Sequence, residues 1–498
     1  DIGSKSGVTG LSSSSSNITI RADLYDFNGL TPDIATSGNV TWEPISSSNS
    51  FGEDVYTSWF SWNQNSQTMS GLTIGKPTNE KNVTINSALS VAGPISVYGG
   101  VIAINSNLNT TDGGAAGDVL LKASSNITQG NNVDITTDGS DVIYWADSND
   151  NSNGFISFGS AGGQDIVTSG GDVYLAGGAG TTVPTGYAHG NTAASGVSLP
   201  MGTTRGLINT SNGGGTAGDI IIRGKSTGNF HGIYFDSFQL FGYDITLDGE
   251  TGNAANYGVR LGSYYIYNDI PGANKSQVLD ADNDLTITAV NTTASYAGNA
   301  LRTGINPRLY VDGNFTLNSS GDLNYTSQQS FININPGKTL SVNFDGTATF
   351  TTSLGDPNLS RPQGNLVIQP YQQDSFISAF SSINWSFNNN LTGLTIGKAT
   401  NTANVTVGSA TTIAGPISIY GGDITLSNSL TASGTMLLQS SGAVTQASAV
   451  SATTLSLQGS GTFTLNDTNN HVNTLTAGTS TQTTGNISYT NKDALTIG

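Results

Sequence analysis

Apolar and polar positions alternate in short runs along this chain. From Gly434 onward such apolar runs (MLL, AVT, LSL, FTL, LTA, ISY, LTI) begin about every 8 to 13 residues. An apolar residue at every second position fits a β-strand that packs one face on a core. Charged residues, which include the strong helix formers Glu, Lys and Arg, make up 10% of the chain. We therefore predict an all-β chain of short strands.

A small motif precedes many of these strands. It consists of Gly, then Asp or Asn, then two apolar residues separated by one position. The Asp or Asn side chain is suited to bond a turn backbone, and we expect the Gly to supply the positive φ of a tight corner. Two or three such strands would form one coil of roughly 22 residues. The instances of the motif are Gly117-Asp118-Val119, Gly171-Asp172-Val173, Gly218-Asp219-Ile220, Gly313-Asn314-Phe315 and Gly422-Asp423-Ile424.

A long internal repeat organises the chain. The segment Gly71 to Ile102 recurs as Gly393 to Ile424, with 22 of 32 positions identical. Weaker similarity upstream and downstream extends the repeating unit. We predict that residues 1–37 end a preceding unit, 38–363 form a full unit and 364–498 form part of a second one. A chain divided in this way is expected to be a piece of a longer polypeptide.

Stacking short strands between sharp corners predicts a parallel β-helix, a β-solenoid in which like side chains form ladders along the axis. The alternative is a string of β-sandwich domains, each of about 100 residues. The repeat exceeds 320 residues, and no shorter unit has comparable identity. This length favours the solenoid. The two copies should then form the same coil, with Val83, Ile85, Ile95 and Val97 matching Val405, Val407, Ile417 and Ile419.

Composition excludes several classes of function. The formal net charge is −18, from 34 acidic and 16 basic residues, so a nucleic-acid backbone would be repelled. No run of 18 apolar residues occurs, which argues against direct membrane insertion of this segment. The absence of Cys excludes disulfides and thiolate metal sites, and is compatible with an oxidising exterior.

The segments SVAGPISVYGG and TIAGPISIYGG, together with GGDITL-like and GDVxLxA-like runs, resemble the repeat regions of giant cell-surface adhesins of Bacteroidota, including gliding-motility adhesins. They are more distantly similar to β-helices of the filamentous-haemagglutinin type. The resemblance implies type IX secretion, anchoring at the outer membrane and an extracellular, cell-surface location. It further implies contact with a surface or polysaccharide. The expected role is that of a structural and adhesive stalk, and not of an enzyme.

One acidic cluster is a candidate metal site. Asp280, Asp282 and Asp284 alternate on a short predicted turn, and such carboxylates are suitable calcium ligands. The alternative is a solvated corner before the strand that begins at Leu285. No other cofactor is expected. The stretch 147–154, DSNDNSNG, reads as an Asx-rich loop.

Aromatic residues concentrate between Phe230 and Tyr267 and between Trp42 and Trp62. Exposed rings stack on sugars, and Tyr264 and Tyr265 are the candidate carbohydrate ligands because alternation forces one of them outward. The alternative is that most of these rings fill the core.

An alternative function is that of a carbohydrate-processing or carbohydrate-binding β-helix protein. For catalysis it would have to draw on Asp280, Asp282, Arg302 and Arg308. The three histidines, His189, His231 and His471, lie far apart in the sequence and are expected at the surface.

Overall fold

The computed structural model describes residues 10–27, 29–45, 49–62, 68–112, 114–200, 206–211, 216–236, 238–262, 278–293, 299–303, 308–325, 331–350, 353–354, 363–479 and 484–498. Strands make up 51% of the chain and helices 1%, which confirms the all-β prediction. The chain divides into two compact units, Asp1–Asp282 (unit 1) and Asn283–Gly498 (unit 2). Among the described residues of unit 1, two short 3-10 helices, η1 (Thr57–Trp59) and η3 (Gly114–Gly117), interrupt the strands.

Unit 1 is built from three parallel sheets, which we call faces 1, 2 and 3. Face 1 contains β2 (Ile18–Arg21), β4 (Asn39–Glu43), β7 (Gly71–Ile74), β10 (Ile95–Gly99), β13 (Val119–Ala123), β16 (Val142–Ala146), β19 (Val173–Gly180), β24 (Ile220–Ser226) and β27 (Ile245–Thr251). Face 2 contains β5 (Val55–Tyr56), β8 (Val83–Ile85), β11 (Ile102–Ile104), β14 (Ile127–Gln129), β17 (Ile156–Phe158), β22 (Val197–Leu199), β25 (Ile233–Phe235) and β28 (Val259–Leu261). Face 3 contains β9 (Leu89–Val91), β12 (Leu108–Thr110), β15 (Asp134–Thr136), β18 (Asp165–Val167), β23 (Gly206–Asn209), β26 (Phe238–Gly242) and β29 (Val278–Ala281), and a further parallel sheet joins β1 (Gly10–Ser12), β3 (Asp33–Ala35) and β6 (Ser61–Trp62).

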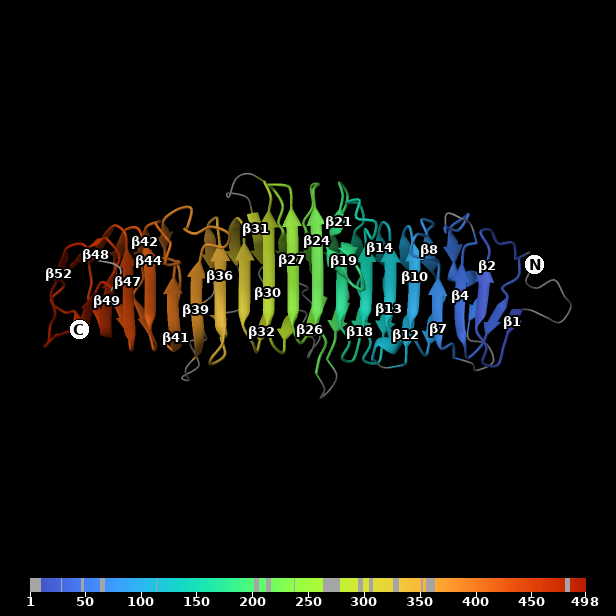
Figure 1. The fold of residues 1–498 in the computed structure, drawn as a ribbon, viewed down its shortest axis with the longest axis horizontal. Coiled ribbons are helices and arrows are strands. Elements are labelled where there is room, and N and C mark those ends of the chain that lie inside the picture. The colour runs from blue at the N-terminus through green and yellow to red at the C-terminus, as the bar shows by residue number, and fades with distance from the viewer. Residues whose placement is uncertain are drawn as a thin grey trace. The chain divides into compact units, whose positions relative to one another are not determined.

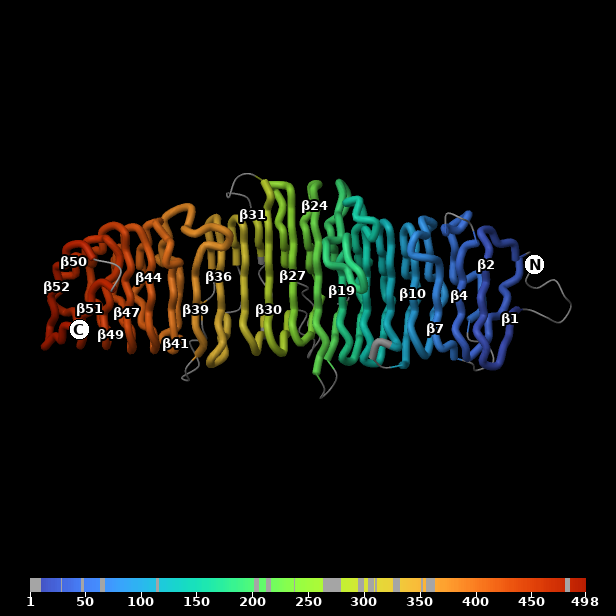
Figure 2. Tube along the Cα trace, in the orientation of Figure 1, coloured from blue at the N-terminus to red at the C-terminus, as the bar shows by residue number. Residues whose placement is uncertain are grey.

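Each coil of unit 1 takes one strand from each face in turn, so consecutive coils lie side by side along the blue-to-green part of the chain (Figure 1; Figure 2). Neighbouring strands within a face are parallel. The exceptions among the described pairings are β19 with β20 (Pro184–Gly186), an antiparallel hairpin that leads to β21 (Ala188–Gly190), and a single antiparallel bridge between Gly154 and His189. This arrangement is a parallel β-helix with three strands per coil. The alternative of tandem β-sandwiches is wrong, because sandwiches are made of antiparallel strands.

Unit 2 repeats the design. Its longest sheet contains β30 (Leu285–Asn291), β33 (Phe315–Ser319), β36 (Thr339–Phe344), β39 (Gln363–Gln369), β41 (Leu391–Ile396), β44 (Ile417–Gly421), β47 (Thr435–Ser440), β49 (Val450–Gln458), β51 (His471–Ala477) and β53 (Thr496–Ile497). A second sheet contains β31 (Asn299–Thr303), β34 (Asp322–Tyr325) and β37 (Ala348–Phe350), and a third contains β40 (Phe380–Ser381), β42 (Val405–Val407), β45 (Ile424–Leu426), β48 (Ala443–Gln446), β50 (Thr462–Leu465) and β52 (Ile487–Tyr489). β43 (Thr411–Ile413) pairs with β46 (Leu430–Ala432), which in turn pairs with β49. The remaining strands are β35 (Phe331–Ile332), which pairs with β38 (Ser353–Leu354), and β32 (Arg308–Val311).

The core consists of columns of apolar side chains, one from each coil. Each member of a column is buried and lies in register with the next. A face 1 column of unit 1 is Val40, Leu72, Ile95, Val119, Val142, Val173, Ile220 and Ile245. The matching column of unit 2 is Phe315, Leu340, Leu366, Leu394, Ile417, Met436, Leu455 and Leu475. Burial of these columns in every coil is the main source of stability.

The internal repeat forms the same coil in both units, as the sequence predicts. Val83 pairs with Ile102 in the first copy, and Val405 pairs with Ile424 in the second. The strands from β7 to β11 and from β41 to β45 match in order and in their buried positions. The predicted unit boundaries at 37/38 and 363/364 concern sequence repetition. They differ from the boundary between the compact units, which lies at 282/283.

A buried asparagine holds a corner of the repeated coil in each copy. Asn79 donates to the carbonyl oxygen of Tyr98 at 2.8 Å, and Asn401 donates to that of Tyr420 at 2.7 Å. Each side-chain oxygen accepts a backbone N–H of the preceding coil at 3.1 Å. These bonds satisfy a polar group that would be costly to bury without partners.

Asp and Asn ladders link the corners of successive coils, which supports the predicted role of the motif. In unit 1 each carboxylate accepts the backbone N–H of the next ladder residue, at 2.8 to 3.2 Å. The ladder, which we call the acid ladder, consists of Asp118, Asp141, Asp172, Asp219 and Asp244.

The predicted reason for the motif glycines, a positive φ, is wrong. Gly117, Gly171, Gly218, Gly313 and Gly422 are not among the described residues with positive φ. Instead, a Cβ at Gly171 would lie 2.1 Å from the carbonyl oxygen of Ser140 in the preceding coil. The other four positions have backbone oxygens at 2.1 to 2.4 Å. Glycine is therefore required at these corners by close approach of the backbone rather than by a left-handed conformation.

Candidate ligand-binding pocket

One long coil departs from the regular design of unit 1. Successive members of the acid ladder are 23 residues apart between Asp118 and Asp141, but 47 residues apart between Asp172 and Asp219. The additional residues include the β19–β20 hairpin (green in Figure 1), after which β21 returns to face 1 and pairs with β24. Despite the insertion, β19 and β24 pair in the same register as their neighbours. The hairpin is therefore extra chain that leaves the pairing of the coils unchanged.

The corner between β21 and β22 lies over part of the outer surface of face 2 and borders a pocket of about 300 Å³. The floor is a row of outward side chains at paired positions of four successive strands, namely Ser157, Ser198, Tyr234 and Arg260. The walls come from this corner and from the turn before β25, and they consist of Ala193, Ala194, Ser195, Phe230 and His231. Small apolar groups, hydroxyls and two basic side chains thus meet in one cavity.

His231 and Arg260 are the basic groups of the pocket. His231 is buried, with 8% of its surface exposed. The backbone N–H of Tyr257 donates to its Nδ1 at 3.1 Å, while Arg260 Nη1 lies 3.2 Å from its Nε2. Arg260 also extends over the ring of Tyr234, 5.3 Å from the ring centroid. These contacts fix the guanidinium at the floor of the pocket.

Tyr234 is held in position by a buried carboxylate. Its hydroxyl donates to Asp236 Oδ2 at 3.1 Å. Burial of the phenol, and then the neighbouring Asp236 carboxylate, raise the pKa of Tyr234, whereas Arg260 acts in the opposite direction. The phenol therefore stays neutral at physiological pH, and the Tyr234 ring presents a rigid surface below Arg260.

A second group of charges anchors the inserted hairpin to face 1. The Tyr187 hydroxyl donates to Asp248 Oδ2 at 3.1 Å, and Arg223 donates to the carbonyl oxygen of Thr185 at 2.8 Å. Lys225 forms a 2.6 Å ion pair with Glu250 on the neighbouring strand. Burial raises the pKa of Asp248, and the hydrogen bond from Tyr187 partly offsets this. The contacts of Tyr187 and Thr185 hold the insertion against the coil, and the Lys225–Glu250 pair links the two strands beneath it.

The candidate calcium ligands lie near the end of unit 1 and the start of unit 2. Asp280 is in β29, and Asp282 is exposed in the turn that follows. Asp284 Oδ1 accepts the backbone N–H of Asn314 at 2.7 Å, so this carboxylate serves as a corner ladder residue. Among the described residues, no three His, Asp or Glu side chains gather in a group suited to hold a metal ion.

The Asx-rich loop is confirmed. Both carboxylate oxygens of buried Asp147 accept backbone N–H groups of its own loop, from Asn151, Ser152 and Asn153 at 3.1 to 3.2 Å. The carboxylate therefore serves to close the loop.

The predicted carbohydrate ligands Tyr264 and Tyr265 lie outside the described residues, as do Tyr267 and the rest of 263–277. Elsewhere in the aromatic-rich stretch the rings divide between core and surface. Phe235 and Phe238 are buried in the core, whereas Phe230 and Tyr234 line the pocket. Arg302 is exposed on β31, and Arg308 begins β32.

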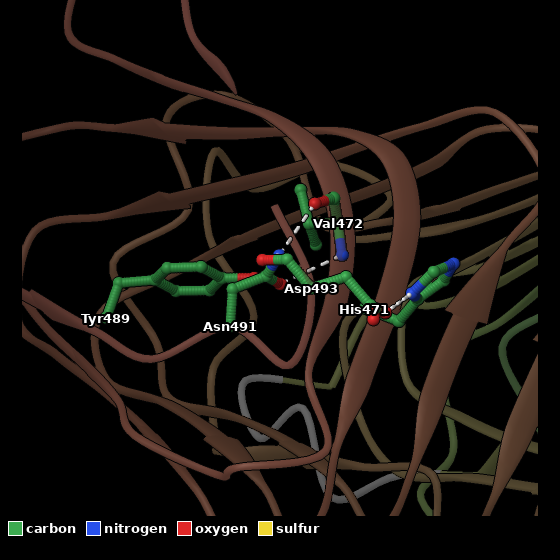
Figure 3. A network of polar contacts seen from close by, with 5 residues as sticks. All are labelled: His471, Val472, Tyr489, Asn491 and Asp493. Atoms are coloured by element: carbon green, nitrogen blue, oxygen red, sulfur yellow. Dashed lines mark hydrogen bonds and ion pairs between the residues drawn. The ribbon is translucent and has the colours of Figure 1, made fainter. Parts of the chain in front are cut away.

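The histidines occupy three different environments. His189, in β21, is half-buried and forms a backbone bridge with Gly154. The expectation of a surface position is wrong for His231, because it is buried in the turn before β25, where it forms part of the pocket wall. His471, in unit 2, is exposed, and its Nδ1 lies 2.7 Å from Asp493 Oδ2. Figure 3 shows that pair beside Asn491, whose side chain bonds both the N–H and the carbonyl of Val472 at 3.0 Å. This network joins neighbouring coils at the surface.

Sequence reasoning missed the pocket residues Arg260 and Tyr234 and the role of His231. The spacing of the corner motifs lengthens between Gly171-Asp172 and Gly218-Asp219, which indicates extra chain in that coil but not the pocket. The corner that walls the pocket is as long as the matching corner of the next coil. Which strands form the floor beneath it depends on register, and the motif spacing does not give the register.

The chain matches no family model, no curated protein and no solved structure.

None of the helices among the described residues has the length and apolar character needed to cross a membrane.

Proposed function

We propose that this chain is a structural stalk segment of a large bacterial cell-surface adhesin. The observation that carries the proposal is the repeated coil, which has the same strands, the same register and the same buried asparagine in both units. Catalysis needs a single active site, and it gives no reason to repeat an entire coil. Repetition of an entire coil design instead suits a protein whose function is to extend and bear load.

The hydrogen-bond pattern supports a mechanical role. Within each unit, strands of successive coils pair along the coil axis, and the acid ladder adds a side-chain bond at the corner. A force along that axis must break bonds on several faces of a coil together. A core without disulfides can resist such a force through the number of these bonds.

Location and partners follow from the same proposal. The stalk would be exported through an outer-membrane pathway such as type IX secretion, be anchored at the cell surface, and support attachment or gliding on a surface or polysaccharide. The resemblance of the AGPIS-containing segments to Bacteroidota adhesin repeats supports this assignment.

Single-molecule pulling on the full chain tests the load-bearing role. We expect stepwise unfolding in which groups of coils open at forces well above those that stretch an unfolded chain. A matched chain with Gly75→Ala and Gly397→Ala, which strain the repeated coil, should open at lower force. Smooth extension without resolved unfolding steps would contradict the proposal.

A second experiment addresses the alternative of a carbohydrate-processing protein. The chain is incubated with neutral and acidic polysaccharides, and their lengths are followed by size-exclusion chromatography. The stalk proposal expects the lengths to stay unchanged. Shortening that is lost in an Asp280→Asn, Asp282→Asn variant would favour the enzyme.

A further inference from the structure

We propose that the pocket on face 2 of unit 1 binds a sugar acid, with Arg260 and His231 holding its carboxylate. This binding site goes beyond the stalk function and does not depend on it.

Two hydrogen-bond donors point at the His231 imidazole, one at each ring nitrogen. Arginine stays protonated and has no acceptor atom, and a neutral imidazole has one N–H and one acceptor nitrogen. The Tyr257 N–H points at Nδ1 of His231, and Arg260 points at Nε2. In either neutral tautomer, one of these two contacts therefore sets a donor against a donor.

An oxyanion resolves this conflict. With Nδ1 accepting from the Tyr257 N–H, Nε2–H and the Arg260 guanidinium become two donors 3.2 Å apart. A carboxylate placed against both would accept one bond from each, and charge-assisted bonds of this kind are among the stronger ones in proteins. Among the described residues, Arg260 forms no salt bridge. The guanidinium can therefore take an anionic partner from solution.

The remaining lining suits a small hydroxylated ring. Ser157, Ser195 and Ser198 present hydroxyl groups, which both donate and accept bonds with sugar hydroxyls. Phe230, Ala193 and Ala194 supply apolar surface for the C–H face of a ring. A cavity of about 300 Å³ is at the small end of the usual range for ligand sites. It therefore fits one sugar acid residue rather than a long oligosaccharide.

The distribution of charge over the chain should restrict binding of an acidic ligand to the pocket. The chain carries a net charge of −18, so its general surface repels anions. At physiological ionic strength such repulsion is screened beyond roughly 8 Å. An acidic ligand should consequently bind where Arg260 and His231 meet it directly.

Isothermal titration calorimetry on the full chain, at physiological salt, tests the proposal with sodium glucuronate. Glucose is the neutral probe of matched ring size, and inorganic sulfate is an anion without a ring. We expect saturable glucuronate binding, with glucose and sulfate each at least tenfold weaker. Arg260→Ala should weaken glucuronate binding at least tenfold, and Arg260→Lys by a smaller factor. Arg302→Ala, an equal charge change on an exposed strand of unit 2, should leave affinity unchanged.

The contrary results are distinct. Equal affinity for glucose would remove the role of the carboxylate, and equal affinity for sulfate would reduce the site to a general anion site. Undiminished glucuronate binding by Arg260→Ala would place binding elsewhere. Absence of any glucuronate binding by the unmodified chain would reject the site. Circular dichroism checks the fold of each variant, and Arg260→Gln replaces Arg260→Ala if the latter is unfolded.

Discussion

Single glycines set the shape of the repeated coil at the residue scale. Gly75 and Gly397 occupy matching positions and have φ of +82° and +83°. A Cβ at these positions would lie 2.4 Å from the carbonyl oxygen of Tyr98 and 2.5 Å from that of Tyr420. Both the left-handed backbone and the lack of space require glycine.

Alanine at either glycine should therefore destabilise the protein. We expect Gly75→Ala and Gly397→Ala each to lower the free energy of unfolding by about 1–3 kcal/mol, because backbone strain and a steric contact are introduced together. Urea denaturation followed by circular dichroism measures the effect. Gly434→Ala is the matched control, since a Cβ there has its nearest atom at 3.5 Å. If Gly397→Ala were as harmless as this control, the assigned role would be wrong.

The acid ladder is the relevant feature at the scale of the element. Burial is the main cause that raises the pKa of Asp118, Asp141 and Asp219 above the ordinary value of 3.8. Charges of neighbouring ladder carboxylates raise the pKa of Asp141 and Asp219 further. The folded protein therefore binds protons at these sites more readily than the unfolded chain.

The raised pKa values fix the direction in which pH changes the free energy of unfolding. A raised carboxyl pKa in the folded state means that these groups destabilise the fold when ionised. The free energy of unfolding should rise as the pH falls from 7 through the raised pKa values toward about 3.8. Denaturation at several pH values measures it. Asp141→Asn keeps an acceptor for the Asp172 N–H and removes one charge, so it should flatten the dependence. A loss of stability over the same pH range would contradict this account.

The sequence predicts where the corners and strands lie better than it predicts why each residue is needed there. Gly171-Asp172-Val173 indicates a corner followed by a strand, and both are present. The role of Gly171 was misjudged because the carbonyl it approaches belongs to Ser140, in another coil. Contacts between coils depend on register, which local patterns do not encode. The pocket escaped prediction for the same reason, since Tyr234 and Arg260 meet through pairing of β25 with β28.

Metal independence is a prediction for the whole molecule. Among the described residues, no three acidic or histidine side chains form a metal-binding group, and Asp284 bonds a backbone N–H. A chelator such as EDTA should therefore leave the unfolding midpoint unchanged, as should added calcium. Differential scanning calorimetry makes the comparison. A midpoint that falls with EDTA, recovers with calcium and becomes insensitive in Asp282→Asn would instead restore the calcium site.

The coil between Asp172 and Asp219 spans 47 residues, against 31 for the coil before it and 25 for the coil after it, yet β19 and β24 pair as regularly as the strands of shorter coils do. This coil therefore accepts added chain without disturbing the coils on either side. The end of β19 is in effect a grafting point, at which a new hairpin can arise by a single insertion event. A lineage of such proteins can change what it binds while its supporting architecture is inherited intact, and a designer can exploit the same tolerance.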